Sequence, residues 1–250
     1  MKIVWDERGS GRPLLLIQGL GYARWSWEPI LPGLAERYRV VSFDNRGIGD
    51  SDKPPGPYAA RDMAGDALQV LDEAGIERAH VLGVSLGGMI AQELAVAAPE
   101  RVDRLVLCCT TPGGEATVPM PAVTVQLFAE AGSLPPEVAL RRFVENGLAA
   151  DAPPELVEEL YRRRLANPPD PVGWLAQAAA AMGFAGVDGA IDAPTLLLTG
   201  TDDNVVDRRN TDVLAERLPG ARVERLRATG HLFFWEQPDA VVRIVTEFLE

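Results

Sequence analysis

The sequence of 250 residues contains few residues of the types that often form catalytic and metal sites. It has only two histidines, two cysteines and two lysines, so arginine carries nearly all of its positive charge. No Walker loop, C-x-x-C pair or histidine pair at metal-ligand spacing occurs, and we therefore expect no metal, nucleotide or other cofactor. The formal net charge of −12 disfavours nucleic acids and anionic membranes as partners, because clustered lysine and arginine bind both.

Long apolar runs are also missing. No stretch approaches the roughly 20 apolar residues that a membrane-spanning helix needs, and residues 1–12 lack the apolar core of a signal peptide. We therefore expect a cytoplasmic protein whose acidity serves solubility. The two cysteines, Cys108 and Cys109, are adjacent near the end of an apolar run, where neighbouring side chains point to opposite faces. We expect two reduced, packed thiols.

The sequence does contain a regular alternation of short apolar runs with longer helical patterns. The expected strands are residues 13–17, 39–43, 79–83, 104–109, 195–199 and 222–226, and the expected helices are residues 60–74, 86–98, 211–217 and 238–249. Most of the strand segments are apolar almost throughout, which is typical of strands that are covered on both faces. The pattern predicts an α/β fold with a mostly parallel central sheet flanked by helices.

The segment from residue 113 to residue 189 interrupts the alternation. It has helical stretches and clustered prolines but no convincing strand, and pairs of prolines precede Glu137 and Glu155 as they do at helix starts. We predict an all-helical insertion over 113–189 in a core formed by residues 1–112 and 190–250. A homo-oligomer is compatible with the sequence.

Residues 83–87 form a G-x-S-x-G pentapeptide between an apolar run and a helical stretch. A serine on a sharp strand-to-helix turn exposes its hydroxyl, and small flanking residues suit the strained backbone there. If Ser85 is a nucleophile, it needs a general base, which is usually histidine. His80 lies five residues earlier on the same expected strand, roughly 16 Å away. His231 is therefore the candidate base.

A carboxylate should orient this histidine and stabilise its charged form. The loop after the strand at 195–199 offers Asp202, Asp203 and Asp207. We predict that Asp203 is the acid, with Asp202 as the alternative. Two adjacent acids cannot both face one histidine, so the other is expected to lie in solvent or to cap the next helix. The resulting order of serine, acid and histidine is that of one hydrolase fold.

Four motifs in this order make the chain similar to the α/β-hydrolase fold family over essentially its whole length. Residues 83–88 resemble the nucleophile elbow, residues 44–51 the D-x-R-G-x-G-x-S turn, residues 194–203 the strand that carries the acid, and residues 230–238 the histidine loop and last helix. The resemblance implies that the insertion is a cap and that the substrate cleft lies between cap and core.

An acyl-transfer site also needs hydrogen-bond donors for the oxyanion. The amide of Leu86 is one candidate, because it follows the serine at the positive end of a helix. The amide of Leu20, in the loop after the first central strand, is the second. The family commonly has histidine where Gln18 stands, a departure that bears on loop shape and substrate preference. The side chains predicted to line the cleft, with core packing as the alternative for each, are Trp25, Phe128, Trp174 and Phe233.

Two other interpretations are weaker. Residues 19–21 with Asp44 at the end of the next strand superficially resemble a dinucleotide fingerprint, but Arg24 stands where the third glycine is needed. Arg46, a conceivable anion ligand, belongs to a turn that resembles a structural element of the family, in which its guanidinium would pair locally.

A serine at the elbow narrows the chemistry within the family. Members similar to haloalkane dehalogenases and epoxide hydrolases have aspartate there, so Ser85 disfavours both. We predict a carboxylesterase-like or lactonase-like enzyme that acts on a small, largely apolar molecule. The alternatives are a C–C bond hydrolase or a haloperoxidase-like perhydrolase on the same triad, and a non-catalytic ligand-binding or receptor protein on the same scaffold.

Overall fold

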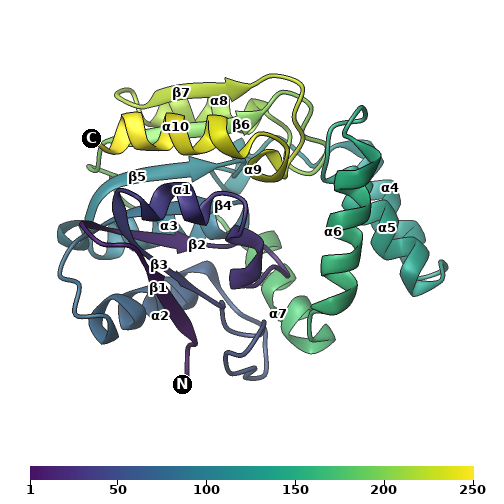
Figure 1. Ribbon diagram of the computed structural model, residues 1–250, viewed down its shortest axis with the longest axis horizontal. Coiled ribbons are helices and arrows are strands. Elements are labelled where there is room, and N and C mark those ends of the chain that lie inside the picture. The colour runs from purple at the N-terminus through teal and green to yellow at the C-terminus, as the bar shows by residue number, and fades with distance from the viewer.

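A seven-stranded sheet forms the centre of the molecule in the computed structural model of residues 1–250 (Figure 1). The strands are β1 (Trp5–Arg8), β2 (Arg12–Ile17), β3 (Tyr38–Phe43), β4 (Ala79–Val84), β5 (Val102–Cys108), β6 (Thr195–Gly200) and β7 (Arg222–Leu226). They lie in the order β1-β3-β2-β4-β5-β6-β7, and every pairing is parallel except that of β1 with β3. The predicted mostly parallel sheet is therefore confirmed. Strand β1 was not predicted, because it is a short edge strand with mostly exposed side chains.

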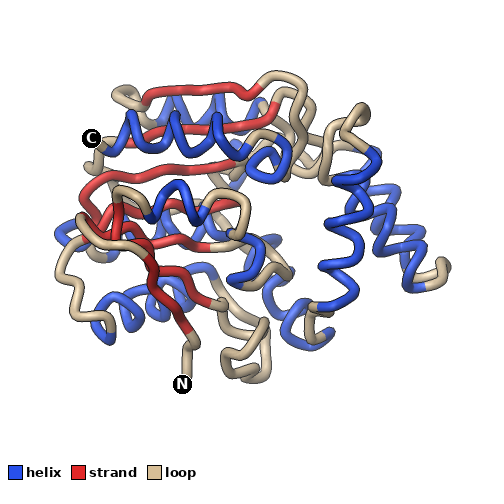
Figure 2. The backbone as a smooth tube through the Cα atoms, viewed as in Figure 1, coloured by secondary structure: helices blue, strands red, loops and turns tan.

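Helices cover both faces of this sheet, as the tube in Figure 2 shows. The core helices are α1 (Leu31–Ala35), α2 (Ala60–Glu73), α3 (Leu86–Ala97), α8 (Arg209–Arg217), α9 (Phe233–Glu236) and α10 (Pro238–Leu249). Alternate strand residues serve the two faces. Leu15 and Val81 pack in one cluster with residues of α2, α3 and α8, whereas Leu14 and Leu82 pack in the other with residues of α1, α9 and α10.

Four further helices form a separate group toward which the parallel strands point (Figure 1). They are α4 (Ala122–Ala131), α5 (Pro136–Asn146), α6 (Pro154–Ala166) and α7 (Pro171–Met182), with no strand between them. Helices α5 and α6 begin at the second proline of the two pairs, so the predicted starts are confirmed. The division into a core and a cap at residues 113 and 189 stays a prediction. No helix of the protein has both the length and the hydrophobicity to cross a membrane.

Helix α3 packs unusually close to the sheet at its first turn. A Cβ atom on Gly87 would lie 2.1 Å from the Ile17 carbonyl oxygen of β2, so no larger residue fits without a backbone shift. Gly83, on the other side of the turn, is equally restricted, because its Cβ would lie 2.2 Å from the Gly87 carbonyl oxygen. The two glycines of the pentapeptide are thus required by the packing of α3 against β2 and β4.

We expect Gly87→Ala to lower the free energy of unfolding by about 3 kcal/mol, because the added methyl group meets backbone that cannot easily move. Gly65→Ala is the matched control. Gly65 lies inside α2 with nothing near its Cβ position, so this change should raise stability by about 0.5 to 1 kcal/mol. Urea unfolding of both variants measures the two effects, and equal stabilities would contradict the close packing.

Candidate active site

Ser85 lies between β4 and α3 in a strained backbone conformation. Its φ of 55° is in the left-handed region that residues other than glycine rarely adopt, with ψ at −118°. The turn is held by the Ser85 amide, which donates to the Cys108 carbonyl at 2.9 Å, and by the Thr110 hydroxyl, which donates to the Ser85 carbonyl at 2.8 Å. No hydrogen bond joins the Ser85 hydroxyl to the His231 ring, and such bonds are often long without substrate.

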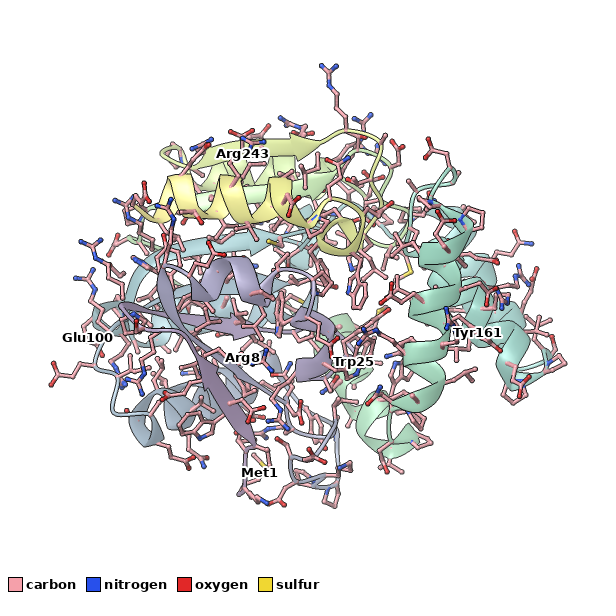
Figure 3. The ribbon with its side chains drawn as sticks, in the orientation of Figure 1. Met1, Arg8, Trp25, Glu100, Tyr161 and Arg243 are labelled. Atoms are coloured by element: carbon pink, nitrogen blue, oxygen red, sulfur yellow. The ribbon has the colours of Figure 1, made fainter.

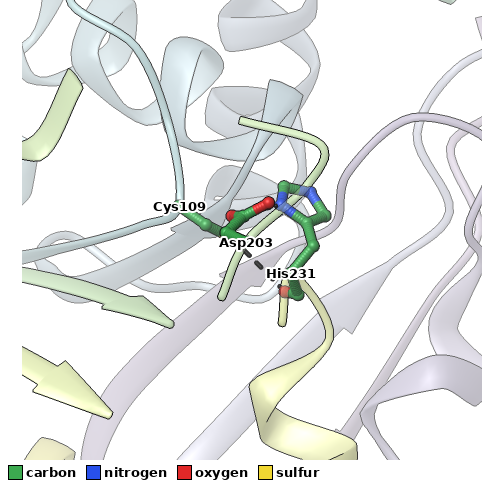
Figure 4. Close-up of side chains that lie close together, drawn as sticks. All are labelled: Cys109, Asp203 and His231. Atoms are coloured by element: carbon green, nitrogen blue, oxygen red, sulfur yellow. Dashed lines mark hydrogen bonds and ion pairs between the residues drawn. The ribbon is translucent and has the colours of Figure 1, made fainter. Parts of the chain in front are cut away.

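Asp203 and His231 meet on the loops that follow β6 and β7 (Figure 4). Asp203 Oδ2 lies 2.8 Å from His231 Nδ1, and both side chains are buried. Asp203 Oδ1 accepts hydrogen bonds from the amides of Val205 and Val206 at 2.7 and 2.9 Å, so both carboxylate oxygens are fixed. Asp202 is exposed and makes no contact with the ring. Of the two candidate acids, the structure brings Asp203 to the histidine.

Cys109 is the third side chain in Figure 4. One potential metal-ligand atom from each of Cys109, Asp203 and His231 lies within 4.8 Å of the others. The Cys109 thiol donates to the His231 carbonyl at 3.6 Å, and burial raises its pKa well above the usual value, so it is a neutral thiol and a poor ligand. The cluster is therefore a histidine–aspartate pair packed on a thiol. Both cysteines are buried and free, which confirms the expected packed thiols.

The loop that carries the histidine is fixed by Glu236. One carboxylate oxygen of Glu236 accepts from the Gly230 amide and the other from the Ala149 amide, both at 2.8 Å. Burial raises the pKa of Glu236, while the two amides favour its charged form. The Leu232 amide also donates to the Gly147 carbonyl at 2.9 Å. The histidine loop is thus joined to the segment that follows α5.

The two amides predicted to form an oxyanion hole, those of Leu20 and Leu86, donate to no acceptor in the protein. Gln18 stabilises the loop before Leu20. Its side-chain oxygen accepts from the Gly19 amide at 2.8 Å, and its carbonyl accepts from the Asn45 side chain at 2.8 Å. Close contact with Ser85 limits residue 19, because a Cβ on Gly19 would lie 3.2 Å from that of Ser85. The loop after β2 therefore lies directly beside the serine.

Gln177 of α7 connects the helical group to this loop. Its fully buried side chain accepts from the Gly21 amide at 3.0 Å and donates to the Arg46 carbonyl at 2.8 Å. This residue was not predicted from the sequence, because a glutamine in a helix is usually exposed to solvent. The available signal was its helical spacing from Gly173 and Ala180, which share the buried face of α7.

The four side chains predicted to line a cleft do not form one group. Trp174 of α7 packs over Gly21, and its ring lies 6.3 Å from that of Phe128 on α4. Trp25 lies on the side of the core that faces α6, with its ring 6.1 Å from that of Trp235 (Figure 3). Phe233 has no exposed surface and packs in the core. The prediction for Phe233 is therefore wrong, because a cleft residue needs exposed surface.

His80, the other histidine, and Arg46, the conceivable anion ligand, each lie beside a carboxylate of the protein. His80 is buried toward the other end of β4, with Nδ1 3.4 Å from the Asp103 carboxylate, and burial lowers its pKa. The Arg46 guanidinium makes two hydrogen bonds to the Asp66 carboxylate, at 2.6 and 2.7 Å. Arg46 thus pairs locally.

The sheet order, the strained serine turn and the buried histidine–aspartate pair together define the hydrolase class that the motifs suggested. Residues 12–238 match the sequence profile of the alpha/beta hydrolase fold, so the chain belongs to this family. A poly(3-hydroxyalkanoate) depolymerase of Ectopseudomonas oleovorans is 30% identical, over 95% of this chain and 84% of its own length.

Solved structures agree with this assignment. The enol-lactonase from Burkholderia xenovorans LB400 superposes with a TM-score of 0.85 at 26% identity, covering 99% of this chain and 96% of the enol-lactonase chain. The meta-cleavage product hydrolase from Pseudomonas fluorescens IP01 superposes with a TM-score of 0.84 at 27% identity, covering 99% and 93% of the two chains. The fold and the relatives support an enzyme of the hydrolase type.

Replacing Gln177 with leucine should loosen the loop beside the serine, since the Gly21 amide would lose its acceptor. A hydrogen bond contributes about 1 kcal/mol, so amide hydrogen exchange over residues 19–21 should become roughly fivefold faster. Gln126→Leu is the control, because its exposed side chain on α4 bonds only to Glu130. Unchanged exchange in the Gln177 variant would show that α7 does not order the loop.

Proposed function

We propose that the protein is a serine hydrolase that cleaves a carboxylic ester or lactone of a small, largely apolar molecule through an acyl-enzyme. The observation that carries the proposal is the 2.8 Å contact between Asp203 and His231, on loops at the same edge of the sheet as the strained Ser85 turn. A carboxylate bound to Nδ1 leaves Nε2 of the histidine free to act as a base, which is the arrangement that activates a serine.

In the proposed mechanism, Ser85 Oγ attacks the carbonyl carbon while His231 Nε2 takes the hydroxyl proton. The amides of Leu20 and Leu86 donate to the oxyanion, and Asp203 stabilises the imidazolium. Collapse of the tetrahedral intermediate expels the alcohol, which receives the proton from His231. A water molecule then transfers a proton to His231 as it attacks the acyl-enzyme, and His231 returns a proton to Ser85 Oγ as the acid leaves. The reaction needs no metal or cofactor.

The relatives support this chemistry without naming the substrate. A depolymerase of a polyester and an enol-lactonase are consistent with attack on an ester or lactone carbonyl. Cleavage of a C–C bond on the same triad is a second candidate, favoured by the likeness to a meta-cleavage product hydrolase. Both reactions begin at a carbonyl carbon, so the same serine, histidine and amides would serve either.

Ser85→Ala should lower kcat for a short p-nitrophenyl ester by about 10⁴-fold or more, because no other group supplies the nucleophile. Steady-state kinetics measures the loss, and an unchanged melting temperature shows that the fold is intact. Full activity in this variant would rule out the serine mechanism.

Covalent labelling by a fluorophosphonate separates an enzyme from a receptor on the same scaffold. An activated Ser85 is labelled in the wild-type protein and not in Ser85→Ala, as intact-mass measurement would report. A wild-type protein that stays unlabelled under conditions that label a known serine esterase would favour the ligand-binding alternative.

Asp203→Asn should lower kcat by about 10⁴-fold, because an amide favours the wrong histidine tautomer and cannot stabilise the imidazolium. Asp202→Asn is the matched control, since Asp202 is exposed beside the same strand, and it should change kcat by less than about twofold. A severe loss in the Asp202 variant alone would mean that the acid has been wrongly assigned.

A further inference from the structure

Arg164 on α6 differs from every other buried charged residue of the protein. The three buried aspartates each have a basic partner: Asp44 has Arg24 at 3.2 Å, Asp66 has Arg46 at 2.6 Å, and Asp203 has His231 at 2.8 Å. Arg164 is only 9% exposed, and no carboxylate lies within 4.0 Å of its guanidinium. Buried charges are normally paired, because removing a charge from water is costly. The missing partner therefore needs an explanation.

The guanidinium of Arg164 is held in place by two neighbouring residues of the core. Nη1 donates to the Gly21 carbonyl, and Cζ lies 4.4 Å from the centre of the Tyr22 ring. Nε and Nη2 have no acceptor in the protein, yet neither is a fully buried atom, so both can reach an incoming group. The side chain is thus oriented, with donors still free.

The position of this cation relates it to the proposed reaction. Gly21, which accepts from Arg164, follows Leu20, whose amide is a proposed oxyanion donor. A Cβ on Gly19, two residues before Gly21, would lie 3.2 Å from that of Ser85, so the guanidinium is attached to the loop that lies beside the serine. The surrounding protein is strongly acidic, with a net charge of −12, so anions are attracted only where a local cation offsets that field.

We infer that Arg164 binds a carboxylate of the substrate, and that the substrate is an ester or lactone whose acyl chain ends in a second, ionised carboxyl group. This inference rests on the proposed function and narrows its substrate class. The planar fork of a guanidinium matches a carboxylate, and the substrate's charge supplies the partner that the fold does not. The rest of the substrate's acyl chain would be apolar, in keeping with the Trp174 ring beside Gly21.

Two p-nitrophenyl esters with acyl chains of equal length test the inference, the monoester of glutarate and the neutral valerate. Wild-type protein should prefer the glutarate ester in kcat/KM. Arg164→Gln should lower kcat/KM for the glutarate ester by about 10- to 100-fold, the range expected for lost hydrogen bonds to a charged group, and change that for valerate by less than about threefold. Arg164→Lys, which keeps the charge, should retain part of the preference.

Arg162→Gln is the matched control, because Arg162 is exposed on the same helix and its guanidinium bonds only to the Glu158 carbonyl. Equal losses for both esters in Arg164→Gln would overturn the inference, since they would show that Arg164 only supports the loop through Gly21. The absence of any preference for the glutarate ester in the wild-type protein would overturn it as well.

Binding of free glutarate keeps this test separate from the proposed reaction. Glutarate should raise the melting temperature of the wild-type and Arg162→Gln proteins but not that of Arg164→Gln. If neither ester is hydrolysed and a fluorophosphonate does not label Ser85, the proposed function fails. The Arg164 site would still stand if glutarate stabilises the wild-type and Arg162→Gln proteins but not Arg164→Gln. It falls if glutarate stabilises the wild-type and Arg164→Gln proteins alike, or stabilises neither.

Discussion

The tight turn between β4 and α3 is the constraint on which the rest of the site depends. It holds Ser85 at a positive φ, a conformation that costs on the order of 1–3 kcal/mol and persists only because the surrounding packing fixes it. The turn can form only because Gly83 and Gly87 lack side chains where α3 meets the backbone of β2 and of the turn itself. The same turn places the free amide of Leu86, the first residue of α3, next to the serine. The strained serine and the free amide beside it are thus consequences of one close contact.

The parallel sheet brings the remaining groups to the same edge. Strands β2, β4, β6 and β7 all end there, and the loops that follow them carry Leu20, Ser85, Asp203 and His231. Ligands bind outside the carboxyl ends of the strands in open α/β sheets, so the placement agrees with a general property of the architecture. Helix α7 supports the loop after β2 through the hydrogen bonds of Gln177. The site is therefore built jointly by the sheet and the helical segment.

Much of the fold could be predicted from the sequence, because strands buried on both faces are continuous apolar runs between helical patterns. Strand β1 was missed because three of its four side chains are exposed, and α1 was missed because a short helix containing proline and glycine has no clear periodicity. Asp203 and His231 could be predicted as a pair because the sequence offers few histidines. Arg164 and Gln177 were not predicted, since polar residues in a helix normally face water unless tertiary contacts bury them. Phe233 illustrates the reverse error, because hydrophobicity alone does not distinguish a core side chain from one at a cleft.

The hydrogen bonds between α7 and the core bear on whether helical segments can be exchanged between proteins of this fold. Gln177 recognises the Gly21 amide and the Arg46 carbonyl, and these are backbone groups that nearly every residue type presents. The bonds from Gln177 therefore do not depend on the side chains of the core loops, except at residue 21, where a Cβ would lie 2.6 Å from the Trp174 ring. A helical segment transplanted from another member of the fold would need one correctly placed amide side chain to dock at this point. The path of the core loops and an amide side chain on α7 are thus both needed to join the helical segment to the core at this point.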